Sequence, residues 1–133
     1  MTTPLAGIRV VEMTSVVLGP YACQMLGDLG ADVIKIEPPA GDTNRNLGPH
    51  RNNSDMGSLY LTCNRNKRSV ALDLKSERGR QAALDIIKTA DVVVHNFRPQ
   101  AMTRLGLDYA AVKAVNPERY LLVELRGALY GVI

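Results

Sequence analysis

Cysteine, histidine and aromatic residues are scarce in this 133-residue sequence, and each shortage excludes a class of protein. Cys23 and Cys63 stand far apart with no second pair near either, which excludes a zinc ribbon, a C-x-x-C redox motif and a dense disulfide scaffold. Neither His50 nor His95 has a second ligand residue at metal-binding spacing, so no metal site is predicted. One phenylalanine and no tryptophan leave little for base stacking, which argues against a nucleic-acid partner.

Long apolar runs are missing as well. No stretch approaches the roughly eighteen apolar residues of a membrane-spanning helix. Met1 to Pro4 leads into patterned sequence without the charged and apolar regions of a signal peptide. Together with the scarcity of cysteine, these absences predict a cytoplasmic protein with no membrane partner.

The remaining composition is that of an ordinary globular domain. Hydrophobic residues make up 46% of the chain and charged residues 22%, so a disordered or fibrous segment is excluded. A chain of this length buries about two-thirds of the surface that its unfolded form exposes, which suffices for one core but not for two. We therefore expect one domain at most over residues 1–133.

Strand-like and helix-like patterns alternate along the chain. Short β-branched runs between turn residues predict strands, and apolar residues at three- and four-residue spacing predict helices. The predicted strands are Ile8 to Met13, Ala31 to Glu37, Ser69 to Asp73, Asp91 to His95 and Tyr120 to Leu125; the predicted helices run from Gly19-Pro20 to a stop at Gly30, and over Met56 to Thr62, Lys75 to Ala90, Pro99 to Leu105 and Asp108 to Val115. This alternation predicts an α/β fold with a Rossmann-like, mostly parallel sheet and helices on both faces.

Ligands of such sheets bind outside the carboxyl ends of the strands, which selects four candidate loops. These are Thr14 to Gly19, Pro38 to Asp42, Asp73 to Lys75 and Asn96 to Arg98, and a long irregular segment is expected over Ala40 to Asp55. The first loop carries one glycine, Gly19, in place of the G-x-G-x-x-G turn of dinucleotide-binding enzymes, and no P-loop motif is present. An ordinary NAD-dependent dehydrogenase is therefore disfavoured.

Positive charge is concentrated in one part of the sequence. Between Arg45 and Arg68, five cationic residues face one acid, Asp55, although the net charge of the whole chain is only +3. Arg98 and Arg104 form a second basic group, and guanidinium groups at strand ends can hold phosphate oxygens in bidentate contacts. The pattern favours a phosphorylated ligand, but a solvated loop that keeps the surface soluble explains the composition equally well.

No residue stands out as a nucleophile. Cys23 falls among the apolar residues of the first helix and is expected in the core, whereas Cys63 borders the basic segment and is a candidate for exposure. Neither has a histidine nearby. Aspartates such as Asp42 and Asp73 are explained as turn or strand-end residues.

A series of sequence blocks carries a resemblance to a known family. The blocks are Pro4 to Glu12, Gly19-Pro20, Leu26 to Glu37, Gly41-Asp42 with Arg45, Asn64 to Lys75, Ala90 to Val92, Asn96 to Pro99 and Arg104 to Gly106. Their order and spacing resemble the N-terminal part of the family III CoA-transferases, a group that includes formyl-CoA transferase, carnitine CoA-transferase and the α-methylacyl-CoA racemases. The resemblance extends from Pro4 to about Tyr120.

The resemblance implies an acyl-CoA substrate, a carboxylic acid as acceptor and no permanently bound cofactor. It also implies roles for individual residues. Val16 and Val17 would lie near the active-site end of the first loop, Lys67 and Arg68 would point toward CoA phosphates, Asn96, Phe97 and Arg98 would run along CoA, and Arg104 would contact a phosphate.

The same resemblance implies a reaction and an assembly. In the transferases an aspartate attacks the thioester and then holds CoA as an aspartyl-CoA thioester. That aspartate is expected beyond Ile133, so residues 1–133 are expected to be a truncated N-terminal part, inactive alone, of a protein that forms interlocked homodimers. A racemase acting on 2-methylacyl-CoA and a non-catalytic CoA-binding or interaction fragment are the alternatives.

Overall fold

A sheet of five parallel strands forms the centre of the computed structural model, which describes residues 3–50, 55–117 and 121–124. The strand order is β3-β2-β1-β4-β5. The strands are β1 (Arg9–Met13), β2 (Asp32–Glu37), β3 (Lys67–Ala71), β4 (Val92–His95) and β5 (Leu121–Glu124). The predicted Rossmann-like parallel sheet is confirmed.

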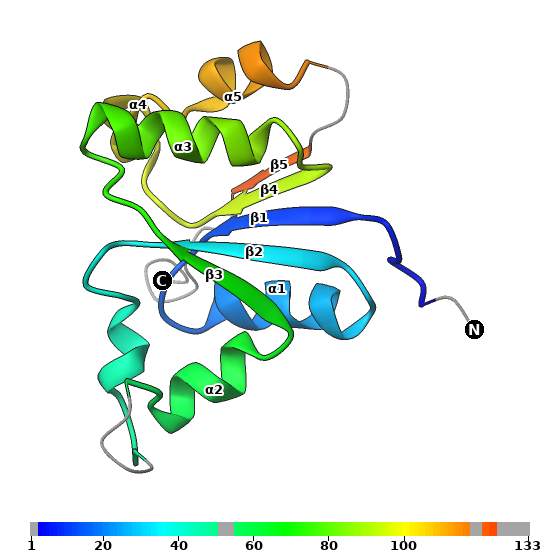
Figure 1. Cartoon of the computed structure of the whole chain (residues 1–133), viewed down its shortest axis with the longest axis vertical. Helices are drawn as coiled ribbons and strands as arrows, with labels where there is room; N and C mark the ends of the chain where they lie inside the picture. The colour runs from blue at the N-terminus through cyan, green and yellow to red at the C-terminus, as the bar shows by residue number, and fades with distance from the viewer. Residues whose placement is uncertain (1–2, 51–54, 118–120, 125–133) are drawn as a thin grey trace, which may run out of the picture.

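Helices cover both faces of this sheet (Figure 1). One face carries α1 (Leu18–Asp28) and α2 (Ser58–Asn64), and the other carries α3 (Glu77–Ile87), α4 (Pro99–Leu105) and α5 (Tyr109–Val115). A short 3-10 helix, η1 (Thr43–Asn46), follows β2 inside the segment expected to be irregular. Over the described ranges, no helix combines the length and the apolar character needed to cross a membrane.

The chain adds strands to one side of β1 first and then to the other side, so the strand order reverses at β1. The unit β1-α1-β2 places Val10 opposite Val33, and β3 extends the sheet on the same side. The chain then passes through α3 to the other side of β1, where Val11 lies opposite Val93 of β4. The loops after β1 and β4 therefore diverge at a switch point, which is where parallel α/β sheets usually bind ligands.

Apolar side chains fill the space on each side of the sheet. Val11, Met13 and Ile36 pack against the α3 side with Ala83, Ile87, Ala90, Val93, Met102, Leu107 and Val112. A smaller cluster of Val10, Cys23, Ala31, Val33 and Val94 lies on the α1 side. Full burial of one aliphatic side chain contributes about 1.5–3 kcal/mol, so these two layers give the loops at the sheet edge a rigid base.

Local signals determine where several helices begin and end. Ser76 caps α3, because its hydroxyl accepts a hydrogen bond from the backbone N–H of Gly79 at 3.0 Å. Gly106 adopts a left-handed conformation with φ of 65° between α4 and α5. Glycine tolerates this conformation because it has no β-carbon.

The start of β3 differs from the prediction by two residues. Lys67 and Arg68 precede the predicted strand Ser69 to Asp73, but they pair with Val33 and Ile34 of β2. Charged residues are common on strands at the edge of a sheet, and β3 occupies the edge of the described sheet. Hydrophobic alternation therefore gave no sign that the strand begins at Lys67.

Candidate functional site

A mainly apolar crevice of about 520 Å³ lies at the carboxyl edge of the sheet. All four loops selected from the sequence contribute to it. Its lining includes Thr14, Ser15 and Val16 after β1, Pro38, Pro39, Gly41 and Asp42 after β2, Leu72, Asp73, Leu74 and Lys75 after β3, and Phe97 after β4. A hollow of this kind suits an apolar segment of a small-molecule ligand.

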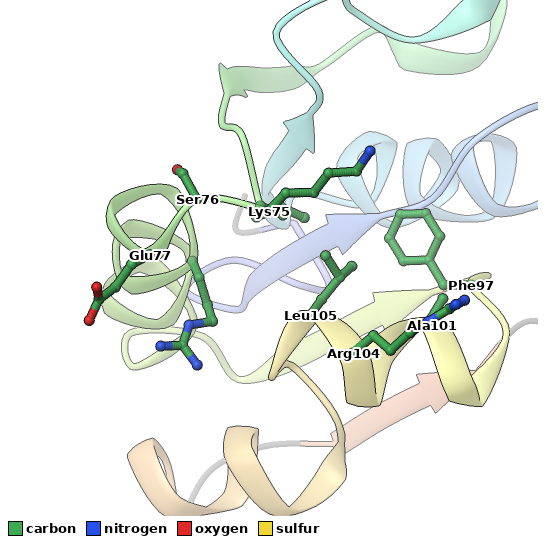
Figure 2. A pocket seen from close by; sticks show the side chains of 9 residues that line it. Lys75, Ser76, Glu77, Phe97, Ala101, Arg104 and Leu105 are labelled. Atoms are coloured by element: carbon green, nitrogen blue, oxygen red, sulfur yellow. The ribbon is translucent and has the colours of Figure 1, made fainter.

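A second hollow of about 750 Å³ lies between α3 and α4, and we call it the basic groove. Figure 2 shows Lys75, Phe97 and Arg104 toward one end of this groove and Glu77 at the other. The groove and the crevice share Leu74, Lys75, Phe97 and Leu105 in their linings, so the two hollows are neighbours. The remaining lining residues of the groove are Ser76, Glu77, Arg80, Ala101 and Arg104.

Cations outnumber acids in the basic groove. Lys75, Arg80 and Arg104 line it together with a single carboxylate, Glu77. Within the described part of the chain, none of these three cations forms an ion pair. Their charges are therefore available to an anionic ligand, and Phe97 adds an aromatic ring beside them.

The basic segment found by composition has a different structure, because acids from elsewhere in the chain neutralise it. The ion pairs are Arg45 with Glu37 at 2.7 Å, Arg65 with Asp28 at 2.7 Å, Lys67 with Glu12 at 2.7 Å and Arg68 with Asp32 at 2.6 Å. Arg51 lies outside the described residues. The partners belong to β1, α1 and β2, so a count of neighbouring charges along the sequence overestimates the free positive charge of this segment.

Lys67 and Arg68, for which phosphate contacts are predicted, line neither the crevice nor the basic groove. The Lys67 side chain is 2% exposed, and its ammonium also donates hydrogen bonds to the carbonyl of Pro20 and to Asn64 Oδ1. Burial lowers the pKa of Lys67, while the nearby Glu12 carboxylate acts in the opposite direction. In this arrangement the ammonium is enclosed by protein groups and faces neither hollow.

A buried ionic network lies next to the crevice and was missed by the sequence analysis. Lys35 Nζ is 3.2 Å from Glu12 Oε1 and 3.0 Å from Asp42 Oδ2, and it donates to the Thr14 carbonyl at 2.9 Å. With Lys67, the network holds two cations and two carboxylates. The available signal was a charged residue inside each of two apolar runs, V-V-E-M and V-I-K-I.

Glu37, at the end of β2, is held by several hydrogen bonds. Arg45 donates to its two carboxylate oxygens at 2.7 and 2.8 Å, Tyr60 donates at 2.7 Å and the backbone N–H of Asp42 at 2.8 Å. Burial acts to raise the pKa of Glu37, but these hydrogen bonds outweigh burial and lower it to about 2. Glu37 is thus an ionised carboxylate that orders the wall of the crevice.

This shift predicts a loss of stability in acid. The folded-state pKa of Glu37 lies below the ordinary value of 4.5, so the free energy of unfolding should fall as the pH is lowered from about 5 toward 2, by on the order of 3 kcal/mol. Urea denaturation at a series of pH values measures this slope. In Glu37→Gln we expect a flatter slope over the same range, and an unchanged slope would assign the acid transition to other carboxylates.

The structure brings only some of the predicted CoA-binding residues to the hollows. Val16, which is 46% exposed, lines the crevice, with Val17 next to it in the chain. Asn96 instead holds the first loop, because its amide accepts from Ser15 N at 3.1 Å and donates to Ser15 O at 2.9 Å. Arg98 is the exposed N-cap of α4 and lines neither hollow.

Arg80 is a groove residue that the sequence analysis did not select. It lies within α3, far in the sequence from Arg104, and its local surroundings are those of an ordinary surface helix. Helical periodicity places Arg80 about one turn after Glu77, near the carboxyl end of β3. That spacing was the only signal available.

Both thiols are buried. Cys23 lies in the core as predicted, and burial raises its pKa to about 12. Cys63 is only 2% exposed, so the expectation of exposure is wrong, and burial raises its pKa as well. It lies on the buried side of α2, a position that the sequence of this short helix did not reveal. In the described ranges, no group of three His, Cys, Asp or Glu side chains could hold a metal ion.

The parallel sheet, its switch point and the two neighbouring hollows define a Rossmann-like α/β unit with a crevice at its carboxyl edge. Residues 5–131 match the family model described as CoA-transferase family III. The chain therefore belongs to CoA-transferase family III.

Individual relatives are similar over most of this chain. Formyl-CoA:oxalate CoA-transferase of Streptomyces avermitilis is 44% identical over 128 residues, which are 96% of this chain and 31% of that protein. Succinate–glutarate CoA-transferase of Agrobacterium fabrum is 44% identical over 121 residues, 86% of this chain and 30% of that protein. A crystal structure of a CAIB/BAIF family protein from Brucella suis matches with a TM-score of 0.84 and 40% identity, over 92% of this chain and 33% of that one. The chain thus spans about a third of the length of these relatives.

Proposed function

We propose that this chain supplies the CoA-binding part of an enzyme that transfers CoA between carboxylic acids. The observation that carries the proposal is a cationic groove directly beside an apolar crevice, with four lining residues in common. CoA has phosphates at one end and a long, largely uncharged arm that ends in the thioester. Such a ligand needs cations in one hollow and apolar walls in the next, and Lys75, Arg80 and Arg104 stand where the phosphates would bind.

The names of the relatives support transfer as the reaction. They pair formyl-CoA with oxalate and succinate with glutarate, so we propose small carboxylic acids as donor and acceptor. These names favour a transferase over a racemase acting on 2-methylacyl-CoA.

The reaction that we propose for the whole enzyme passes through covalent intermediates on an aspartate side chain. An aspartate carboxylate attacks the thioester carbonyl and releases CoA thiolate, which leaves a mixed anhydride. The thiolate then attacks the aspartyl carbonyl, which releases the donor acid and forms an aspartyl-CoA thioester. The acceptor carboxylate attacks this thioester and releases CoA thiolate, and the thiolate attacks the acceptor's acyl carbonyl, which forms the new acyl-CoA and frees the aspartate. From the resemblance to the family, we propose that the nucleophilic aspartate lies beyond Ile133. Asp42, beside the crevice, is paired with Lys35.

Calorimetric titration with CoA tests the binding part of this proposal. We expect Arg104→Ala and Lys75→Ala each to weaken binding about tenfold or more, because a charge-assisted hydrogen bond contributes about 1.5–3 kcal/mol, and we expect added salt to weaken binding of the wild type. Arg78→Ala is the matched control, since Arg78 is exposed on α3 outside the groove. Equal affinities for all four proteins would leave the groove cations as ordinary surface charge.

A further inference from the structure

We propose that Asn44 is a positioning residue, whose buried amide holds Val16 in a left-handed conformation and so shapes the wall of the crevice. The consequence for CoA rests on the proposed function, whereas the effect of Asn44 on the loop does not. Asn44 belongs to η1, a segment that the sequence analysis expected to be irregular.

The conformation of Val16 needs an explanation. Its φ is 68°, a region that β-branched residues rarely enter because the β-carbon meets the backbone. Val16 is also 46% exposed, so packing in the core does not force it there. Backbone strain of this kind persists only where the surroundings impose it.

Side-chain donors impose this conformation on the loop between β1 and α1. Three successive carbonyls each accept a hydrogen bond from a distant side chain. Thr14 O accepts from Lys35 Nζ at 2.9 Å, Ser15 O accepts from Asn96 Nδ2 at 2.9 Å, and Val16 O accepts from Asn44 Nδ2. The last of these acts directly on the strained residue.

Asn44 is itself held firmly in place. It is 1% exposed, and its backbone N–H donates to Asp42 Oδ1 at 2.9 Å. Gly57 packs tightly on η1, where a β-carbon at Gly57 would lie 2.7 Å from Arg45 O and 3.0 Å from Asn44 O. Burial, this hydrogen bond and the close approach of Gly57 together fix the position of Asn44 beside Val16.

The amide of Asn44 is poorly explained by its contribution to folding alone. Within the described part of the chain, its buried Oδ1 receives no hydrogen bond, and an unsatisfied buried acceptor destabilises a fold. The useful contact of the side chain is the donation to Val16 O. Val16 lines the crevice, so this contact links a buried residue to the ligand surface.

A double-mutant cycle tests the mechanical link without any ligand. Val16→Gly removes the strain at this position. We expect the change in Tm that it causes to be about 3 °C more positive in the wild-type background than in the Asn44→Ala background, because Val16 is already free to relax in Asn44→Ala. Equal changes of Tm in the two backgrounds would overturn the proposal. Asn44→Leu, which keeps a similar volume but has no donor and adds no charge, should behave like Asn44→Ala.

Titrations with two ligands test the consequence for binding. Adenosine 3′,5′-bisphosphate carries phosphates but no pantetheine arm, so it should use the basic groove without the crevice. We expect Asn44→Ala and Asn44→Leu to weaken CoA binding about tenfold and to leave binding of adenosine 3′,5′-bisphosphate unchanged. Equal loss for both ligands would indicate general loosening and would overturn the proposal.

Asn116→Ala is the matched control for these titrations. Asn116 is a buried amide that donates to Ile87 O at 3.1 Å and to Ala90 O at 2.7 Å, far from the first loop. We expect this variant to lower Tm and to leave the relative affinities for the two ligands unchanged. If the wild type binds neither ligand, the proposed function fails, and the change in Tm still decides the role of Asn44.

Discussion

Glu12→Gln should lower the free energy of unfolding by about 3–5 kcal/mol, a large part of the stability of a chain of this size. The Glu12 side chain is fully buried between Lys35, at 3.2 Å, and Lys67, at 2.7 Å. Glutamine keeps the shape but removes the charge, which leaves two buried ammonium groups with Asp42 as the only carboxylate of the network. Urea denaturation followed by circular dichroism near neutral pH measures the loss.

A second substitution should reverse part of this effect. In Glu12→Gln/Lys67→Met one unpaired ammonium is gone, so we expect the double variant to be more stable than Glu12→Gln alone. Asp85→Asn, at an exposed carboxylate on α3, is the control and should change stability by less than about 0.5 kcal/mol. A cost for Glu12→Gln as small as that of the control would show that the network contributes little to the fold.

The purified 133-residue chain should show no turnover of CoA between acids, because we assign the aspartate nucleophile to a segment beyond Ile133. Acetyl-CoA and succinyl-CoA with oxalate as acceptor are suitable probes, and hydroxylamine traps any acyl-enzyme anhydride or thioester. Formyl-CoA:oxalate CoA-transferase of Streptomyces avermitilis, assayed with formyl-CoA and oxalate, is the positive control.

Turnover proportional to the concentration of the chain would contradict this prediction. The first residue to examine would then be Asp73, which is exposed and lines the crevice, whereas Asp42 is buried against Lys35. Loss of that turnover in Asp73→Asn would assign the reaction to this chain. Binding of CoA without turnover agrees with the proposed division between a CoA-binding part and a catalytic part.

The secondary structure was predictable because its signals are local. Ser76 caps α3 through a contact three residues away, and Gly106 separates α4 from α5 through its own backbone freedom. The apolar runs of β1, β2 and β4 required a sheet buried on both faces, which only parallel strands with helices on each side provide. β3 was misplaced by two residues because its pairing with β2, rather than its own pattern, determines where it begins.

The candidate site was predictable in its position but only in part in its residues. Parallel topology places the carboxyl ends of the strands at one edge, so the four loops could be selected from strand assignments alone. Which cations remain free depends on partners that the sequence separates. Arg68 and Arg104 carry the same group, yet Arg68 is paired with Asp32 at 2.6 Å and Arg104 lines the basic groove.

The sequence by itself determined the alternation of strands and helices, the edge of the sheet that carries the ligand loops and the resemblance to the family, because these depend on short-range patterns and on the order of blocks. Only the tertiary structure decided that Lys67 is buried against Glu12, that Arg80 and Arg104 line the same groove and that Asn44 reaches Val16. The two residues of each pair are more than twenty positions apart in the sequence, and the reason is physical. Side-chain charges and amides act over a few ångströms in space, and the packing of the helices on the sheet determines which of them come that close.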